Sequence, residues 1–351
     1  MKKIIAILTL ITMMLVSVPA FADEVGIIKY SANTDSAIFT LTKDQLDRDH
    51  TDSTLRYYIF SVNGIVVRAN KNNFYDHDLD KVEFSVGSRE FSVKFTYQDK
   101  STVNVADFPI AMHYTVSGDD ITEYSVPVFG NKILTVDKAD AKKMEFSTTV
   151  AGKFSVKNYE FSDVKDASKW YYKYINTCAA YGILSGMGDG TFKPGDHVTR
   201  AQLAVMIVRS TDNVISYRID EKLKFDDVAK GKWYYDAIMK CATMGIVFGK
   251  TEKQFAPDEP ATREQIAAVV ARVVGILGSF GGSELPDASK QDELKTLYKD
   301  HASVSNYARS NVLLCNKLQI MVGDYGNFRP KSNTTRAECA VIFYKLKKSV
   351  I

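Results

Sequence analysis

The segment HVTRAQLAVMIVRS, residues 197–210, joins a Thr-Arg pair to a run of apolar side chains that suits a buried helix. The same combination recurs in PATREQIAAVVARV, residues 260–273, and in NTTRAECAVIFYKL, residues 333–346. An arginine in the first turn lies at the positive end of the helix dipole, where a cation is disfavoured. Three helices that begin in this unfavourable way indicate that the arginine serves a purpose other than helix formation.

The sequence upstream of each Thr-Arg pair repeats with nearly constant spacing. In all three copies, a phenylalanine precedes the arginine by 8 residues and a proline precedes it by 6. An aromatic residue precedes it by 30, 30 and 29 residues, which pairs Trp170 with Arg200, Trp233 with Arg263 and Tyr307 with Arg336. Each copy combines a helical pattern that starts at the aromatic residue, a loop of Gly, Asp and Pro, and the Thr-Arg helix. We therefore expect three helix–loop–helix repeats, over residues 159–220, 221–283 and 284–351.

Each Thr-Arg helix also has the sequence of a capping box, in which the N-cap hydroxyl and the N3 side chain exchange hydrogen bonds with backbone amides. The pairs are Thr199 with Gln202, Thr262 with Gln265, and Thr335 with Glu338. The box explains these residues but leaves the arginine without a role. A guanidinium beside free helix amides suits an anion. The structural alternative is a salt bridge to an acid of a neighbouring repeat, such as Asp236.

All four cysteines lie in the repeats. Cys178, Cys241 and Cys315 follow the aromatic position of their copies by 8 residues, and Cys339 occupies a position that is Leu or Ile in the other copies. Positions shared with aliphatic residues belong to a core, so we expect buried free thiols. A redox or metal cluster is the alternative, but no CxxC motif or nearby histidine supports it.

Residues 23–158 have a different pattern, with short alternating stretches such as AIFTLT, KVEFSV, FSVKFTY and KMEFSTT. Asn63-Gly64, between two such stretches, predicts a two-residue hairpin. Eight or more short strands favour a β-sandwich or a barrel-like module. The fold class is therefore α+β multidomain, an all-β sandwich-like module followed by an all-α unit of three repeats.

The first 22 residues read as a secretory signal peptide. Lys2 and Lys3 precede an apolar run over residues 4–18, and Ala20-Phe21-Ala22 has the form of a cleavage site. A membrane anchor is the alternative, but the run is short and ends in Pro19. We therefore expect an exported chain with no membrane span after cleavage. The 45 basic and 42 acidic residues nearly balance, and no basic block indicates a nucleic-acid partner.

The motifs F-x-D-V, W-Y-Y, G-I, G-x-x-D-G-T-F-x-P and T-R-A-Q/E together resemble the S-layer homology (SLH) domain. In copy one they fall at residues 161–164, 170–172, 182–183, 186–194 and 199–202, and most recur in copy two. Copy three departs from the pattern. It lacks the tryptophan, and we expect it to begin at LPDA, residues 285–288, with an insertion over residues 289–305.

The resemblance implies a pseudo-threefold bundle whose inter-repeat grooves bind secondary cell wall polysaccharide, often an anionic glycan with pyruvate ketals. The implied binding residues are the motif arginines and the aromatic positions: Arg200, Arg263, Arg336, Trp170, Trp233 and Tyr307. The chemistry of these side chains is consistent with that role, since a guanidinium pairs with a carboxylate and an aromatic ring suits a sugar face. The resemblance also implies localisation at the cell wall or S-layer, with other surface proteins as partners.

An enzyme would have to reside in residues 23–158. That stretch contains His50, His77 and His113 but no HExxH motif, GxSxG motif or cysteine. YDHDLD, residues 75–80, suits a solvated turn better than a calcium site. We therefore expect a non-catalytic anchoring protein with no metal or cofactor. The alternatives are a wall-tethered glycan hydrolase or carbohydrate-binding module in these residues, and a module that self-associates into a surface lattice.

Overall fold

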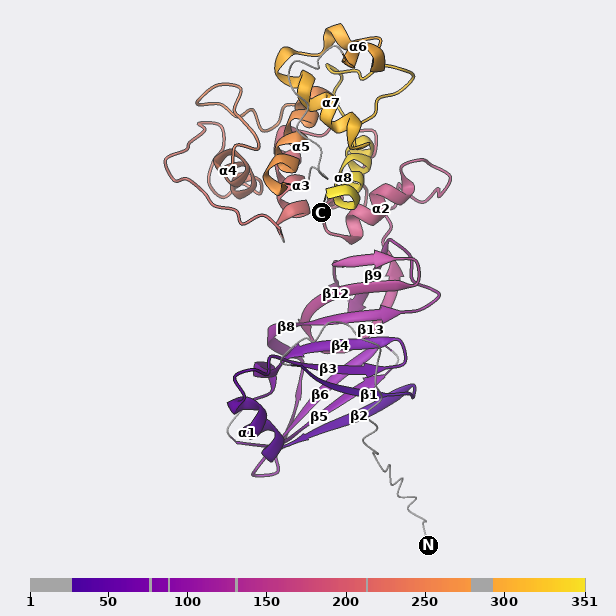
Figure 1. Ribbon diagram of the computed structural model, residues 1–351, viewed down its shortest axis with the longest axis vertical. Helices are drawn as coiled ribbons and strands as arrows, with labels where there is room; N and C mark the ends of the chain where they lie inside the picture. The colour runs from indigo at the N-terminus through magenta and orange to yellow at the C-terminus, as the bar shows by residue number, and fades with distance from the viewer. Residues whose placement is uncertain are drawn as a thin grey trace.

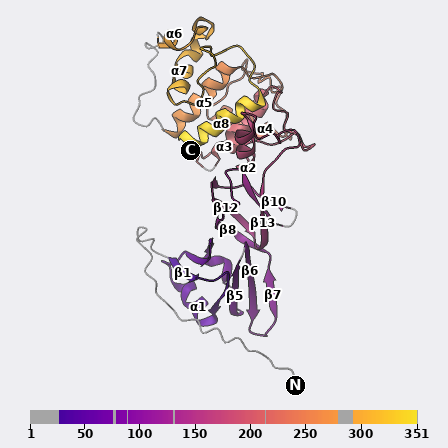
Figure 2. The ribbon, with the colours of Figure 1, turned by 90° about the vertical axis from the view of Figure 1, so that its right-hand side faces the viewer.

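The computed structural model describes residues 27–350 except 76–77, 88, 130–131, 213 and 279–292. A β-rich module and a helical unit follow one another along the long axis of the molecule (Figure 1, Figure 2). The predicted signal peptide, His77 and the LPDA segment lie outside the described residues.

Two sheets form the β-rich module. The first has the strand order β1-β3-β4-β8-β12-β11, and the second has the order β10-β9-β13-β6-β5-β2 with β7 beside β6. Strand β1 runs parallel to β3, and the other described pairs are antiparallel. The strands are β1 (Ile27–Ala32), β2 (Ser36–Thr42), β3 (Tyr57–Val62), β4 (Ile65–Asn70), β5 (Leu79–Gly87), β6 (Glu90–Tyr97), β7 (Thr102–Val105), β8 (Asp107–Ser117), β9 (Ser125–Phe129), β10 (Lys132–Ile133), β11 (Lys138–Asp140), β12 (Lys143–Val150) and β13 (Gly152–Asn158). The expectation of a β-rich first module is confirmed.

Aromatic side chains from both sheets meet in the core of this module. Phe60 of β3 stacks on Phe84 of β5 with ring centroids 4.2 Å apart, and Phe146 of β12 lies 5.4 Å from Phe154 of β13. All four rings are buried, and alternate residues of β3 and β4 point into the same core. The alternation of apolar and polar residues in the sequence therefore reflects one buried face on each of these strands.

The predicted hairpin is confirmed. Asn63-Gly64 joins β3 to β4 with Val62 opposite Ile65. Both turn residues have positive φ, 21° and 81°, as the twist of a two-residue hairpin requires.

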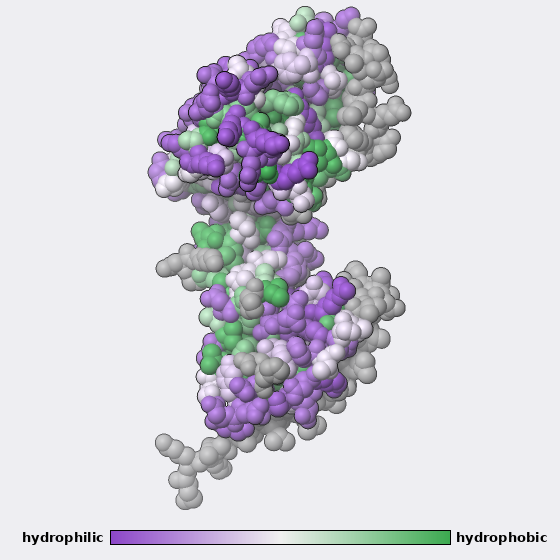
Figure 3. All heavy atoms as spheres, turned by 90° about the vertical axis from the view of Figure 1, so that its left-hand side faces the viewer, coloured by the Kyte–Doolittle hydropathy of each residue, from purple (hydrophilic) through white to green (hydrophobic). Residues whose placement is uncertain are grey.

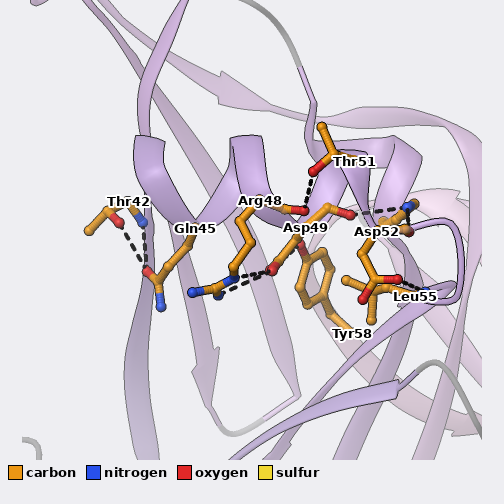
Figure 4. A network of polar contacts seen from close by, with 9 residues as sticks. Thr42, Gln45, Arg48, Asp49, Thr51, Asp52, Leu55 and Tyr58 are labelled. Carbon is orange, nitrogen blue, oxygen red and sulfur yellow. Dashed lines mark hydrogen bonds and ion pairs between the residues drawn. The ribbon is translucent and has the colours of Figure 1, made fainter.

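Helix α1 (Lys43–Thr51) was not expected, because its sequence KDQLDRDHT lacks an apolar stripe. Polar contacts hold it instead, as Figure 4 shows. Thr42 donates its backbone N–H to Gln45 Oε1 at 2.9 Å, and Tyr58 donates to the buried Asp49 carboxylate at 2.9 Å.

The helical unit contains α2 (Tyr172–Ala180), α3 (Arg200–Thr211), α4 (Tyr235–Thr243), α5 (Arg263–Leu277), α6 (Glu293–Leu297), α7 (Arg309–Lys317) and α8 (Arg336–Val350), with short 3-10 turns η3 (His301–Ser303) and η4 (Asn306–Ala308). Each repeat supplies one pair: α2 with α3, α4 with α5, and α7 with α8. The first helix of each pair begins later than predicted. Trp170, for example, lies in a turn two residues before α2.

The segments that precede α3, α5 and α8 are joined in a closed ring of backbone hydrogen bonds. Val198 N donates to Thr334 O at 3.0 Å, Thr334 N to Ala261 O at 3.1 Å, and Ala261 N to Val198 O at 2.9 Å. The second helix of each repeat therefore starts from a common centre. The first helix of each repeat packs on the second helix of the preceding repeat in cyclic order: α4 on α3, α7 on α5, and α2 on α8.

The third repeat begins at Tyr298, so the expectation that it begins at LPDA and carries an insertion over residues 289–305 is wrong. Tyr298 contacts Phe328 at 5.4 Å between ring centroids, as Phe161 contacts Phe192 at 5.2 Å. Asp300 then accepts from the backbone N–H groups of Phe328 and Arg329 at 2.8 and 2.7 Å. Tyr298–His301 is therefore the counterpart of F-x-D-V, hidden by the Phe-to-Tyr and Val-to-His changes.

The two parts of the molecule are joined through repeats one and three. Val136 N donates to Ala180 O at 3.0 Å, and Ala139 N donates to the Tyr181 hydroxyl at 2.9 Å. Glu123 accepts from Lys173 Nζ at 2.9 Å and from the Tyr344 hydroxyl at 3.0 Å. Figure 3 shows a narrower waist at this junction, where hydrophobic residues gather. The junction is thus packed and hydrogen-bonded rather than a bare linker.

Candidate functional site

Three grooves run between the repeats, and each takes its lining from all three. We name each groove after the repeat that supplies its loop and second helix. The first groove is lined by Ser185, Gln202, Arg209, Trp233 and Arg336 among others. The second is lined by Phe248, Gln265, Arg272, Tyr307 and Arg200 among others. The third is lined by Glu338, Lys345, Trp170, Arg263 and Arg329 among others. Their volumes are about 320, 320 and 490 Å³.

The predicted binding residues therefore come together, but in crossed sets. Each motif arginine lies in the same groove as the aromatic residue of a different repeat: Arg336 with Trp233, Arg200 with Tyr307, and Arg263 with Trp170. The aromatic side chains are 64%, 53% and 58% exposed, in that order. An exposed flat ring beside a cation is an arrangement that suits a charged sugar.

The capping box left the arginines without a role, but the structure gives them one in joining the repeats. Arg336 is 3% exposed and donates to the carbonyls of Phe192 and Ser185 at 2.7 and 2.8 Å. Arg200 makes the same pair of bonds, to the carbonyls of Phe255 and Phe248 at 2.8 and 2.6 Å. These bonds cross from one repeat to the next. Burial lowers the pKa of the Arg336 guanidinium, yet arginine stays charged at neutral pH.

The arginines also contact the ring of the phenylalanine whose carbonyl they bind. The guanidinium carbon lies 4.5 Å from the Phe255 centroid for Arg200 and 4.3 Å from the Phe192 centroid for Arg336. A hydrogen bond and a cation–π contact to one residue fix the guanidinium in place. The alternative of a salt bridge to an acid of a neighbouring repeat is confirmed for Arg263, whose Nη1 lies 3.2 Å from Glu338 Oε1. The candidate acid Asp236 is wrong for Arg200, because the described hydrogen bonds of Arg200 go to backbone carbonyls.

The helix amides beside the arginines are not free, contrary to expectation. Arg200 N donates to Glu259 O at 2.9 Å, and Ala201 N donates to Pro257 O at 2.9 Å. The amides at the starts of α5 and α8 meet carbonyls of neighbouring repeats in the same way. The amide of the N3 residue is used by the capping box. In α3, for example, Gln202 N donates to Thr199 Oγ1 at 3.2 Å. These amides are therefore not free for a ligand in the grooves.

Sequence reasoning missed a second cation in each groove. Arg209, Arg272 and Lys345 each follow the motif arginine by nine residues and line the same groove as an exposed aromatic ring. Arg209 is exposed and donates to the Ser185 hydroxyl. Arg272 donates to Ile246 O at 3.0 Å and lies 4.6 Å from the Phe248 centroid. The fixed spacing was the signal that could have revealed them.

The loop that forms one groove wall is held by the aspartate of F-x-D-V. In repeat two, Asp227 accepts from Phe255 N at 2.9 Å and from Ala256 N at 2.7 Å, and Ala256 has a left-handed φ of 60°. Gly249 allows the loop to close, because a Cβ there would lie 2.3 Å from the Thr251 carbonyl oxygen. The acid and the glycine of the motif are therefore scaffold residues.

Tyr307 replaces the tryptophan of the other repeats, and its hydroxyl has a hydrogen-bond partner. Its hydroxyl donates to Glu264 Oε1 at 3.4 Å. Glu264 is 4% exposed and also accepts from Ser305 N and Lys331 Nζ, at 3.0 and 2.6 Å. These contacts orient the tyrosine ring toward the second groove, where it stands near Arg200 and Arg272.

The four cysteines are free and buried, as predicted. Cys178, Cys241 and Cys315 point at carbonyls of the neighbouring repeat, those of Ala340, Ala204 and Ala267, at 3.4, 3.7 and 3.5 Å. Burial raises the pKa of the Cys241, Cys315 and Cys339 thiols to about 12. The thiols are therefore packing groups rather than nucleophiles.

Among the described residues, no cluster of three or more His, Cys, Asp or Glu side chains could hold a metal ion. No helix within those residues is long and apolar enough to cross a membrane.

Comparison with known families identifies the repeats. Residues 160–204, 224–267 and 297–340 each match the family model of the S-layer homology domain. Each match falls within one of the three predicted repeats. The third match starts one residue before Tyr298, in agreement with the corrected start of that repeat.

Similar proteins include an amylopullulanase of Thermoanaerobacterium thermosulfurigenes, 29% identical over 89% of this chain, and an endoglucanase of Bacillus sp. (strain KSM-635), 36% identical over 54%. The S-layer protein sap of Bacillus anthracis is 28% identical over 54% of the chain. The chain spans only 16%, 19% and 21% of these relatives, respectively. The match to the amylopullulanase necessarily includes much of the β-rich module as well as the repeats.

Proposed function

The chain carries three S-layer homology domains in tandem, and on this basis we propose that it is a non-catalytic surface protein whose helical unit binds an anionic secondary cell wall polysaccharide non-covalently. Domains of this family bind cell wall polysaccharide and anchor proteins at the cell surface. The β-rich module is then the part that is displayed, and other surface-layer proteins are its expected neighbours.

One observation carries this proposal: every groove contains an exposed aromatic ring beside at least two cations. The ring suits the apolar face of a sugar, and the cations suit a carboxylate such as that of a pyruvate ketal. Because the aromatic residue and the motif arginine come from different repeats, a groove forms only when the repeats are assembled. Binding and folding of the unit are therefore linked.

The proposal includes a pseudo-threefold bundle of the repeats and a sandwich-like β-module. The closed ring of hydrogen bonds through Val198, Ala261 and Thr334 supports the first, since each repeat relates to the next in the same way. Contacts between rings of the two sheets, such as Phe60 with Phe84, support the second.

The test is co-sedimentation of the full chain with isolated wall polymer, before and after chemical removal of its pyruvate groups. We expect binding that is lost with the carboxylates. Trp233→Ala removes an exposed ring, worth about 1 kcal/mol, and should weaken binding several-fold without unfolding the chain. Tyr325→Ala is the matched control, because Tyr325 is 90% exposed and outside the lining of the three grooves. Equal binding by Trp233→Ala and the unsubstituted protein would refute the proposal.

A second candidate function is a wall-tethered glycan hydrolase or a carbohydrate-binding module in residues 23–158. The names of the amylopullulanase and endoglucanase relatives favour this candidate. Incubation of the full chain with starch, cellulose and wall polymer separates the two proposals. Release of new reducing ends would show that the protein is catalytic.

A further inference from the structure

A further cavity lies where the β-rich module meets the helical unit, and we call it the junction pocket. Its volume is about 210 Å³, and its lining comes from three parts of the chain. The β-rich module contributes Asp137 and Lys138, repeat one contributes Tyr181, and α8 of repeat three contributes Lys347 and Lys348. In Figure 1, α2 and the C-terminal end of α8 lie on the side of the helical unit that faces the β-rich module.

The three packed helix pairs differ at the position that borders this pocket. Eleven residues after the motif arginine, the second helix carries Thr211 in α3, Val274 in α5 and Lys347 in α8. Thr211 and Val274 are 0% exposed, so two of the pairs are closed here by uncharged side chains. Lys347 brings an ammonium to the same position in the pair of α2 and α8, which is bonded to the β-rich module.

The Lys347 ammonium is partly buried but has no acceptor in contact. Its Nζ lies 4.6 Å from the centroid of the Tyr181 ring, and it forms no hydrogen bond or ion pair within the described residues. Burial lowers the pKa of this lysine, while Asp137 and Asp212 attract its charge without touching it. An ammonium that is partly removed from water needs acceptor oxygens in place of its lost hydration.

The other charged groups of the junction pocket already have partners. Lys348 and Lys138 share the Asp140 carboxylate, at 3.4 and 3.7 Å. Asp137 Oδ2 accepts from the Ser147 hydroxyl at 2.7 Å. The lining therefore presents three ammonium groups and one carboxylate, and the ammonium without a contact partner is that of Lys347.

We propose that the junction pocket binds an anionic oxygen group, a carboxylate or a phosphate, whose oxygens accept from the Lys347 ammonium. The hydroxyls of Tyr181 and Tyr344 are already hydrogen-bonded to the β-rich module, so their rings serve as walls of the site. A ligand there touches the β-rich module, repeat one and repeat three at once, and its binding holds them together. The group is either a substituent of the wall polysaccharide or a free anion. Lys347 lies outside the lining of the three grooves, so this site does not depend on the proposed function.

The test is amide hydrogen exchange of the full chain, alone and with inorganic phosphate, acetate or isolated wall polymer, at constant ionic strength. The reporters are the N–H groups of Val136 and Ala139, which donate across the junction to repeat one. A ligand that must leave before the junction opens slows their exchange by the factor 1 + [L]/Kd, which is about tenfold at a concentration roughly ten times Kd.

Three variants separate the pocket from the rest of the protein. Lys347→Met should abolish the slowing and keep the fold, because Thr211 and Val274 are uncharged at the same position. Lys347→Arg keeps the charge and should keep the slowing. Lys317→Met is the matched control and should also keep it, because Lys317 is exposed and pairs with Glu293 outside the pocket. Thermal unfolding of each variant checks the fold.

The quantity that decides is the difference in slowing between the unsubstituted chain and Lys347→Met. A difference with the wall polymer assigns the bound group to the polysaccharide, and a difference with phosphate or acetate alone assigns it to a free anion. No difference with any of the three ligands would overturn the inference. Co-sedimentation of Lys347→Met with wall polymer tests the proposed function separately, since the three grooves are intact in this variant.

Discussion

The third repeat reaches the same scaffold as the first two with different residues, yet it builds a different groove. Tyr298 and Asp300 hold its loop as Phe161 and Asp163 hold that of repeat one. At the groove, Glu338 replaces glutamine. The contacts that hold each loop through backbone groups therefore recur in all three repeats. The side-chain groups that line the grooves differ from one repeat to another.

The largest expected effect on stability concerns the motif arginines, because they join the repeats as well as line the grooves. Arg336→Ala should lower the free energy of unfolding by about 4 kcal/mol, because two charge-assisted bonds to carbonyls are lost at a buried site. Arg200→Ala removes the same bonds from a partly buried site and should cost about 2 kcal/mol. Urea unfolding followed by the helical circular dichroism signal measures both. Equal losses would show that burial does not separate the two arginines.

The next effect tests whether the loops of repeats one and three are equivalent. Asp300→Ala should cost about 3 kcal/mol, because two backbone N–H groups lose a carboxylate acceptor and Arg329 must keep its left-handed φ of 58° without it. Asp163→Ala should cost about the same. Asp324→Ala, at an exposed position in the same loop of repeat three, is the control and should change stability by less than about 0.5 kcal/mol. A neutral Asp300→Ala would break the equivalence.

The smallest effect is expected for chemical labelling of the cysteines, because the thiols of all three repeats are buried. Burial holds the pKa of the Cys241, Cys315 and Cys339 thiols at about 12, so they stay protonated and enclosed at neutral pH. Iodoacetamide should leave the folded chain unmodified and label all four cysteines after unfolding in urea, as mass spectrometry would show. Labelling of a cysteine before unfolding would mean that its repeat opens.

The sequence predicted the repeats, the capping boxes, the buried cysteines and the β-rich module, because each depends on local spacing or alternation. It failed where a contact is non-local. The carbonyl partners of Arg336 lie in repeat one, more than 140 residues away in the chain. Helix α1 lacks an apolar stripe, and the start of repeat three was hidden because a tyrosine can replace a buried phenylalanine. The crossed pairing of arginines with aromatic residues required the assembled structure.

The most direct test of binding in the grooves uses the two tryptophans, which are the only ones in the chain. Trp233 lies in the first groove and Trp170 in the third, so their indole N–H signals report on a glutamine groove and on the glutamate groove. We predict that titration with a methyl glycoside that carries one pyruvate ketal shifts both signals, because each ring lies in a groove that also contains cations. Binding of the glycoside with no shift of either signal would contradict the account.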